Sequence, residues 1–176
     1  MQLRLALESD IDALIDHNRR HIKEPGFEGK LAHPFSPNHE FDWEKRKTDK
    51  LAAMKKSVTE EGWLRSFVLV DSDGTILGEA NIKNIFSGAL HRCQLGMGME
   101  ESVRGQGYGK RLLRMAIEWA RDQDSLYWMD LSYFAFNLPA KKLYTSLGFI
   151  ELFTYEDRIR VDGVSIDDVQ MVLKLK

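Results

Sequence analysis

Residues 104–110, with the sequence RGQGYGK, contain three glycines in five positions and stand between an apolar segment and a strongly amphipathic one. Glycine allows backbone N–H groups to turn into a concavity and leaves room for a ligand that a Cβ atom would block. A helix that begins directly after such a turn adds unpaired N–H groups and the positive end of its dipole. Because Lys110, Arg111 and Arg114 lie close by, the pattern predicts a phosphate-binding turn. The alternative is a tight strand-to-helix turn with solvated cations.

The spacing of these glycines excludes two common phosphate-binding motifs. A P-loop needs two glycines separated by four residues and followed by Lys and Ser or Thr. Here Arg104 takes the place of the first glycine, and Arg111 follows Lys110. The dinucleotide fingerprint Gly-x-Gly-x-x-Gly stands near the start of a βαβ unit, whereas the spacing here is Gly-x-Gly-x-Gly, far into the chain. A nucleotide-binding α/β domain is therefore the weakest reading of the turn.

The turn does fit the pattern Arg/Gln-x-x-Gly-x-Gly/Ala, through Arg104, Gly107 and Gly109. A second motif, N-x-x-A-x-x-L-Y-x-x-x-G-F, follows over residues 137–149. Together with the preceding segment 94–99, these two motifs resemble the GNAT superfamily of acetyl-CoA-dependent N-acetyltransferases. The resemblance runs from about residue 66 to the carboxyl terminus. It implies an α/β (α+β) fold with a mixed, splayed sheet of six or seven strands flanked by about four helices.

The resemblance also implies roles for particular residues around acetyl-CoA, the expected co-substrate. Backbone amides of the turn would bind the coenzyme's diphosphate, the strand before the turn would pair with its pantetheine arm, and an Asn would hydrogen-bond it. The matching residues are Met97, Met99, Arg104, Gly105, Gly107, Gly109, Lys110 and Asn137. Tyr144 matches the general acid for the coenzyme sulfur, since a tyrosine hydroxyl is protonated at neutral pH. A core or boundary aromatic is the other reading of Tyr144.

The residue that would deprotonate the acceptor amine is less clearly marked. Many family members place a Glu on the strand before the turn, where this chain has Cys93 and Gln94. Glu79 on the preceding strand and His91 at the start of the glycine-bearing strand are the candidates, directly or through a water. Each has a structural or surface reading too, and water alone is a further alternative. Cys93 itself reads as a small core residue.

Two further features are open to more than one reading. Gly96 and Gly98 lie inside an expected strand, which indicates either a close backbone approach by a ligand or room for a bulky neighbour. His17 and His21 are spaced i, i+4 on an expected helix, as metal ligands can be. No third ligand is indicated, so we expect no metal site and a solvated or substrate-facing histidine pair.

The elements that must position these residues follow from hydrophobic periodicity and turn signals. We expect strands at 2–6, 66–70, 75–83, 91–99 and 126–132, helices at 11–22, 43–60, 108–121 and 137–147, and a carboxy-terminal hairpin of 150–161 and 164–174. The stretch 24–41 is rich in Pro and Gly and reads as a long loop, either a lid or a surface excursion. We expect one domain over 1–176, with a helix-rich acceptor side at 1–64 and an acetyl-CoA-binding core at 65–176.

Composition limits the classes of function. The chain has 176 residues, 25 Lys and Arg against 27 Asp and Glu, and one cysteine. This balance argues against a nucleic-acid partner, and no segment is apolar enough for a membrane span. We therefore expect a cytoplasmic N-acetyltransferase that moves an acetyl group directly to a primary amine of a small molecule or a peptide or protein. The alternative is a non-catalytic acyl-CoA-binding sensor module, and the carboxy-terminal hairpin offers an edge for a homodimer.

Overall fold

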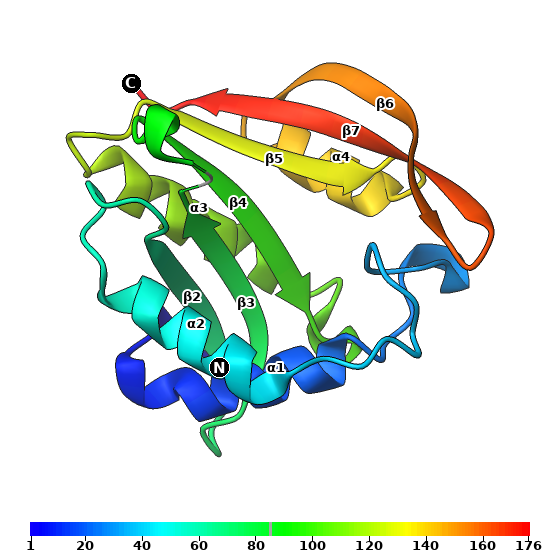
Figure 1. The fold of residues 1–176 in the computed structure, drawn as a ribbon, viewed down its shortest axis with the longest axis horizontal. Helices are drawn as coiled ribbons and strands as arrows, with labels where there is room; N and C mark the ends of the chain where they lie inside the picture. The colour runs from blue at the N-terminus through cyan, green and yellow to red at the C-terminus, as the bar shows by residue number, and fades with distance from the viewer. Residues whose placement is uncertain (85) are drawn as a thin grey trace.

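The computed structural model describes residues 1–84 and 86–176 (Figure 1). Within them the chain forms one seven-stranded sheet and four α-helices. The strands are β1 (Gln2–Leu5), β2 (Leu64–Val70), β3 (Ile76–Lys83), β4 (Arg92–Met99), β5 (Trp128–Phe134), β6 (Ile150–Val161) and β7 (Val164–Lys174). The helices are α1 (Ile11–His21), α2 (Trp43–Lys55), α3 (Tyr108–Arg121) and α4 (Leu138–Thr145). This architecture confirms the expected fold class.

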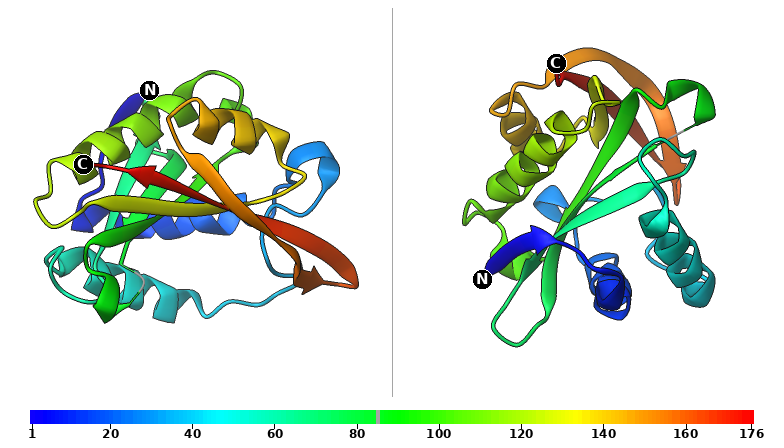
Figure 2. Two further views of the ribbon diagram at one scale, coloured as in Figure 1. Left: turned by 90° about the horizontal axis from the view of Figure 1, so that it is seen from above. Right: turned by 90° about the vertical axis from the view of Figure 1, so that its left-hand side faces the viewer.

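The sheet is mixed, with strand order β1-β2-β3-β4-β5-β7-β6. Strands β1 to β4 pair antiparallel, β4 and β5 pair parallel, and β5, β7 and β6 pair antiparallel. The parallel pair needs a crossover connection, which α3 provides. Helices α1 and α2 cover one face of the sheet, and α3 and α4 lie on the other (Figures 1 and 2).

The core lies mainly between the sheet and α3. The expected apolar stripe of this helix is buried: Leu112, Leu113, Ala116, Ile117 and Ala120. These side chains pack with the inward residues of β2, β3 and β5, including Phe67, Ile82 and Met129, which are almost fully buried. Burying this stripe holds the start of α3 close to the end of β4, and so places the glycine turn at the carboxyl end of this central strand.

The sheet splays between β4 and β5. The two strands pair only at Arg92–Trp128, Cys93–Met129 and Gln94–Asp130, whereas β4 stays paired with β3 as far as Met99. Figure 1 shows β4 and β5 diverging beyond this short region of pairing. From residue 95 onward, β4 therefore has a backbone edge that faces β5 without a partner strand among the described residues. The expected splayed sheet is present.

Several boundaries differ from those expected. Helix α2 ends at Lys55 instead of residue 60, because Lys56 adopts an extended conformation and the Glu60 carboxylate accepts a hydrogen bond from Ser57 N in a separate turn. Strand β5 begins at Trp128 instead of residue 126, because Leu126 is still hydrogen-bonded to Gln123 in the turn after α3. Residues 22–42 form the expected long loop, which holds a single turn of 3₁₀ helix at Phe27–Gly29.

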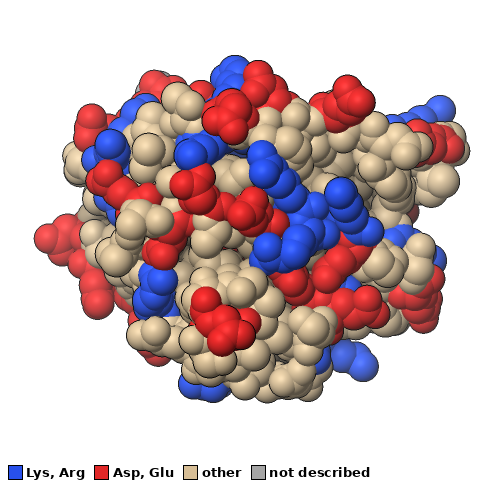
Figure 3. Space-filling view, turned by 90° about the horizontal axis from the view of Figure 1, so that it is seen from below, with Lys and Arg blue, Asp and Glu red and all other residues tan. Residues whose placement is uncertain are grey.

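Charged side chains of both signs are mixed on the face shown in Figure 3. Ion pairs between side chains on helices α1 and α2 include Lys47–Asp12, which joins the two helices, and Arg19–Asp16 within α1. None of the helices in the described part of the chain has the length and apolar character that a membrane span requires.

Candidate active site

The glycine turn begins with a single 3₁₀ turn, Glu101–Val103, after β4 and leads directly into α3. Gly105 and Gly107 have φ values of 73° and 80°, in the left-handed region that other residues rarely adopt. No described atom lies within 4 Å of a Cβ built at either position, so backbone conformation and not crowding explains these two glycines. At Gly109 a Cβ would make only ordinary contacts with Met97 and Met99, which agrees with the Gly/Ala choice in the motif.

The amides of this turn are free to bind an anion. Within residues 1–84 and 86–176, no protein acceptor bonds the backbone N–H groups from Gly105 to Lys110, and the first amide of α3 that is bonded is that of Arg111, to Gly107 O. Gly107 caps the helix without a side-chain hydrogen bond. Consecutive free amides at the start of a 14-residue helix, beside Lys110, suit a diphosphate. The residues present therefore fit the coenzyme that the motif implies.

Arg104 occupies the motif position but directs its side chain back toward the protein. Its Nε donates to Met99 O at 2.8 Å, Nη1 to Pro25 O at 3.2 Å and Nη2 to Glu24 Oε2 at 2.7 Å. Glu24 also accepts hydrogen bonds from the backbone N of Glu101. Arg104 thus ties the turn to the end of α1, which leaves the free amides as the anion-binding groups.

The two faces of β4 differ. Met97 and Met99 lie on the face toward α3, within van der Waals reach of Gly109. On the opposite face, a Cβ at Gly96 would lie 3.2 Å from Asn81 Oδ1, and one at Gly98 would lie 2.7 Å from His21 Nε2. These contacts support the second of the two readings of the glycines, room for a bulky neighbour.

Helix α4 positions the second motif. Asn137 is its N-cap, and its Oδ1 accepts a hydrogen bond from Ala140 N at 3.1 Å. Tyr144 is 7% exposed and packs near Phe149 and Tyr133, so both readings of this residue apply in part. Burial raises the pKa of Tyr144 to about 12. Among the described residues its hydroxyl has no hydrogen-bond partner, although the ring lines the cleft described next.

A cleft of about 740 Å³ brings most of the expected site residues together. Its walls come from the loop after α1, the free end of β4, the glycine turn and α4. They include every cofactor-binding residue expected from the motifs, together with Tyr144: Met97, Met99, Arg104, Gly105, Gly107, Gly109, Lys110, Asn137 and Tyr144. Anion-binding amides, an open strand edge and a protonated phenol thus line one cavity, an arrangement that suits a long phosphate-bearing ligand with a reactive end.

The profile of one protein family, described as the acetyltransferase (GNAT) family, matches residues 29–149, which is more than half of the chain. The chain belongs to the acetyltransferase (GNAT) family. The resemblance inferred from the two motifs is thereby confirmed.

Curated relatives and solved structures agree with this membership. The chain is 29% identical over 108 residues to the [ribosomal protein uS5]-alanine N-acetyltransferases of Escherichia coli (strain K12) and Shigella flexneri. The match covers 61% of this chain and 56% of theirs, so the chain spans about half the length of these relatives.

Two solved structures show the same fold over the whole chain. A ribosomal-protein-alanine N-acetyltransferase from Brucella melitensis has a TM-score of 0.80 at 23% identity, over 99% of both chains. A putative acetyltransferase from Salmonella typhimurium, solved with its cofactor acetyl-CoA, has a TM-score of 0.80 at 20% identity, over 100% of this chain and 94% of that one.

The two base candidates named from this GNAT sequence do not line the cleft. Glu79 is 3% exposed; its Oε1 accepts hydrogen bonds from Lys50 Nζ at 2.6 Å and Ser66 Oγ at 2.5 Å. Burial would raise the pKa of Glu79, but Lys50 and Ser66 outweigh it and hold the pKa below its ordinary value. This carboxylate is committed to a buried ion pair.

His91 lies just before β4, at the end far from the cleft. Met99 is eight positions further along the extended chain, a distance of about 26 Å. Its side chain is exposed, and its carbonyl accepts a hydrogen bond from Tyr127 N at 2.9 Å, where β5 approaches. The structure therefore favours a surface role for His91.

Sequence reasoning missed the histidine that does reach the site, His21, and the buried contact of its neighbour His17. His17 is 1% exposed, its Nδ1 lies 2.9 Å from Glu100 Oε1, and it lines neither cavity described here, so the expectation of a solvated or substrate-facing pair is wrong for this residue. One turn later, His21 lines the cleft above Gly98, and its Nδ1 lies 3.2 Å from Glu24 Oε2. The i, i+4 spacing of the pair and a glycine in the facing strand were the available signals. Only the tertiary contact connects the two.

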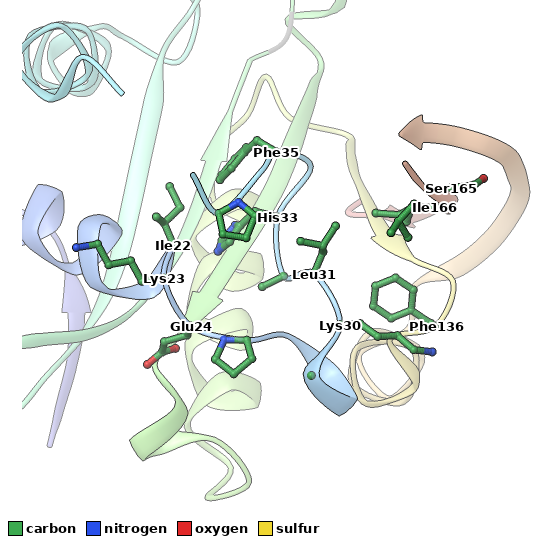
Figure 4. A pocket seen from close by; sticks show the side chains of 15 residues that line it. Ile22, Lys23, Glu24, Lys30, Leu31, His33, Phe35, Phe136, Ser165 and Ile166 are labelled. Carbon is green, nitrogen blue, oxygen red and sulfur yellow. The ribbon is translucent and has the colours of Figure 1, made fainter. Parts of the chain in front are cut away.

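Beside the cleft lies a second cavity of about 620 Å³, between the loop after α1 and the β6–β7 hairpin (Figure 4). Most of its lining is apolar, and Figure 4 shows Leu31 facing Phe136 and Ile166 across it. Leu31 and Ala32 line both cavities, so this part of the loop is the partition between them.

Cys93 does not belong to either cavity. Its side chain is fully buried, and burial raises the pKa of the thiol to about 12. A thiol in this state is a poor nucleophile, because the thiolate is the reactive form. The reading of Cys93 as a core residue agrees with this position.

Proposed function

We propose that this GNAT protein is an N-acetyltransferase that moves the acetyl group of acetyl-CoA directly to a primary amine. The observation that carries the proposal is the row of free amides from Gly105 to Lys110 at the head of a cleft that also contains Tyr144. Family membership and the named activities of the relatives support it. Acetyl-CoA is the co-substrate, and when bound it supplies the activated acetyl thioester.

The chain's residues would then divide the work along the cleft. The turn amides and Lys110 bind the diphosphate, and the open edge of β4 near Met97 and Met99 holds the pantetheine arm. A backbone amide of this edge, near Met97, stabilises the negative charge that develops on the carbonyl oxygen. Tyr144 donates its proton to the departing thiolate. Its pKa of about 12 keeps the hydroxyl protonated across the physiological range.

The second cavity is where we place the acceptor, because its wall at Leu31 and Ala32 is shared with the cleft. Its lining suits an amine on a small apolar group. Among the described lining residues the one carboxylate is Glu24, which already binds Arg104 and the Glu101 amide, and Lys23 and Lys30 add positive charge. This environment disfavours a polycation such as a polyamine.

Among peptide, protein and small-molecule amines, we therefore favour an α-amino group at the start of a peptide or protein. Three of the similar proteins are named for acetylating an alanine of a ribosomal protein, which supports a small apolar first residue. Such an acceptor and acetyl-CoA occur together in the cytoplasm, which is where we propose that the protein acts. The sensor module is the less favoured alternative, because the relatives are acetyltransferases and the cleft contains a tyrosine hydroxyl that is unbonded within the described part of the chain.

Thiol release from acetyl-CoA tests the proposal. The full chain is incubated with acetyl-CoA and, separately, an Ala-initiated peptide, the same peptide with a blocked amino terminus, free alanine and spermidine. We expect thiol release and a mass gain of one acetyl group with the unblocked peptide, and much less with spermidine. Binding of acetyl-CoA without transfer to any amine would favour the sensor module, and faster transfer to spermidine would overturn the acceptor class.

A further inference from the structure

His21 lines the cleft, and its ring packs against that of His33, which lines the second cavity. His21 is the last residue of α1, and its ring lines the cleft beside Gly98 and Met99. A Cβ at residue 98 would lie 2.5 Å from His21 Cδ2 and 2.7 Å from Nε2, so only glycine lets the imidazole edge reach the backbone of β4. The Nε2 atom therefore lies over the strand that is expected to hold the reactive end of the coenzyme.

The other ring nitrogen is held by a carboxylate. Glu24 Oε2 lies 3.2 Å from His21 Nδ1 and also accepts a hydrogen bond from Arg104 Nη2 at 2.7 Å. Because this carboxylate accepts hydrogen bonds from its other neighbours, the His21 Nδ1 atom is the donor in this contact. The proton then resides on Nδ1, and the lone pair is on Nε2, which lies beside Gly98 in the wall of the cleft.

We propose, on the basis of the acetyl transfer proposed above, that His21 is the general base that accepts a proton from the acceptor ammonium at Nε2, with Glu24 as its positioning residue. Glu24 is bonded in turn to Arg104 and to the Glu101 amide of the glycine turn. The base is thus tied to the same segment that binds the diphosphate.

The surroundings of His21 keep its imidazole neutral, with an unprotonated nitrogen available. The groups that face it are His17 on α1, Glu24 after α1, and His33 in the loop, whose ring lies edge-on at 5.0 Å. Burial, with smaller contributions from His33 and His17, lowers the pKa of His21 to about 4, although Glu24 acts in the opposite direction. The imidazole is therefore neutral at physiological pH. The Glu24 carboxylate favours the protonated ring, and so it stabilises the imidazolium that forms when Nε2 takes up a proton.

The proton balance of the transfer is complete with these groups. An ammonium loses two protons in becoming an amide. His21 takes the first and passes it to solvent, and the neutral amine forms the new N–C bond as the C–S bond breaks. Tyr144 gives one proton to the thiolate. The second proton of the amine, lost as the amide forms, replaces it and restores the neutral tyrosine. One proton is released overall.

His21→Gln is the direct test. His91→Gln is the matched control, because His91 is exposed and lies about 26 Å from Met99, beyond the other end of β4. We expect His21→Gln to lower kcat by about 10²–10³-fold while the Kd for acetyl-CoA stays within twofold, since general bases contribute about 10²–10⁴-fold. His91→Gln should match the wild type in both quantities.

A pH profile separates a base from a merely structural histidine. Without the base, the reaction needs an amine that is already neutral. The rate of His21→Gln should therefore rise tenfold per pH unit and approach the wild-type rate near the amine's own pKa. Imidazole added to His21→Ala should restore part of the activity. Gly98→Ala should show the same deficit as His21→Gln, because its methyl group displaces the ring.

The outcomes distinguish the two proposals. An active wild type with an equally active His21→Gln variant, or a deficit that neither pH nor imidazole reduces, overturns the role of His21 and leaves acetyl transfer standing. A wild type that transfers no acetyl group to any amine overturns both.

Discussion

Tyr144 joins two environments, since its ring packs in the core and its hydroxyl meets the cleft. Substitution by Phe keeps the ring contacts with Phe149 and Tyr133 and removes only the proton donor. We expect Tyr144→Phe to lower kcat by about 10²-fold, the usual contribution of a general acid, with nearly unchanged affinity for acetyl-CoA. Single-turnover kinetics and calorimetric titration measure the two quantities. Equal loss of both would remove Tyr144 from the acid role.

Glu79 and Lys50 form a buried ion pair, and this pair predicts a stability effect instead of a catalytic one. Glu79→Gln leaves the Lys50 ammonium buried without its counter-charge, which costs about 3–5 kcal/mol in unfolding free energy. Urea denaturation of Glu79→Gln and of the double variant Glu79→Gln/Lys50→Met measures this cost, and the double variant should recover much of it. At a temperature where it is folded, Glu79→Gln should keep its kcat; a large loss would make Glu79 a candidate base again.

The same pair makes stability depend on pH. The pKa of Glu79 is lower in the folded chain than in the unfolded chain. Its contribution to stability is therefore complete above the ordinary carboxyl range and disappears as the pH falls through the folded-state value. We expect the free energy of unfolding of Glu79→Gln, measured by urea denaturation, to change less with pH in this window than that of the wild type.

At the scale of the elements, the chain supplies a matched pair of glycines. Gly107 in the turn and Gly163 in the β6–β7 hairpin both have φ of 80°, and a Cβ at either position would have no described atom within 4 Å. Alanine at either position should cost about 1–2 kcal/mol of stability through backbone strain. Only Gly107→Ala should also weaken acetyl-CoA binding, by about tenfold or about 1.4 kcal/mol. Equal affinities in the two variants would show that the turn does not bind the coenzyme.

Elements with strong local signals were predicted well from sequence. The bounds of α3 follow from its apolar stripe after the glycine turn, and the hairpin strands follow from Asp162-Gly163 between alternating residues. The end of α2 was predicted less well, because its capping turn at Ser57 depends on one side-chain contact. The cofactor side of the site was accessible because motif residues stand close together in sequence.

The proposed base, His21, could not be predicted from sequence, because the residues around it are far apart in the chain. His21 and Gly98 are 77 positions apart, and their contact exists only because α1 packs across the β3–β4 part of the sheet. Sequence reasoning saw a strand glycine and a histidine pair, and nothing in either indicated the other. A site built from two distant elements is decided by packing, which local patterns do not contain.

For the whole molecule, the short region of β4–β5 pairing is the connection between the two halves of the sheet. Three residue pairs join its two halves there, and Arg92 holds Asp130 across them through Nε–Oδ2 at 2.8 Å and Nη2–Oδ1 at 2.5 Å. Arg92→Lys loses this two-pronged geometry. We expect about 1 kcal/mol lower stability and faster amide hydrogen exchange in β5. Exchange unchanged from wild type would show that the backbone pairs alone hold the two halves together.

The outer edge of the sheet bears on assembly. Strand β6 is exposed along most of its length and carries apolar side chains, including Ile150, Leu152 and Phe153. A homodimer that covers this edge stays a prediction, which sedimentation of the wild type and of Phe153→Glu would test. A monomer in both cases would contradict it.

The free edge of β4 has a consequence for which thioesters can react. From Leu95 to Met99 it extends about 13 Å, and its amides recur at fixed intervals along the strand. When a ligand is anchored at the turn, each of these amides lies at a fixed distance from the anchor. The length of the ligand's arm therefore decides whether its carbonyl lies beside an N–H group. Acyl carriers with a shortened or lengthened arm should therefore bind at the turn and still fail to react.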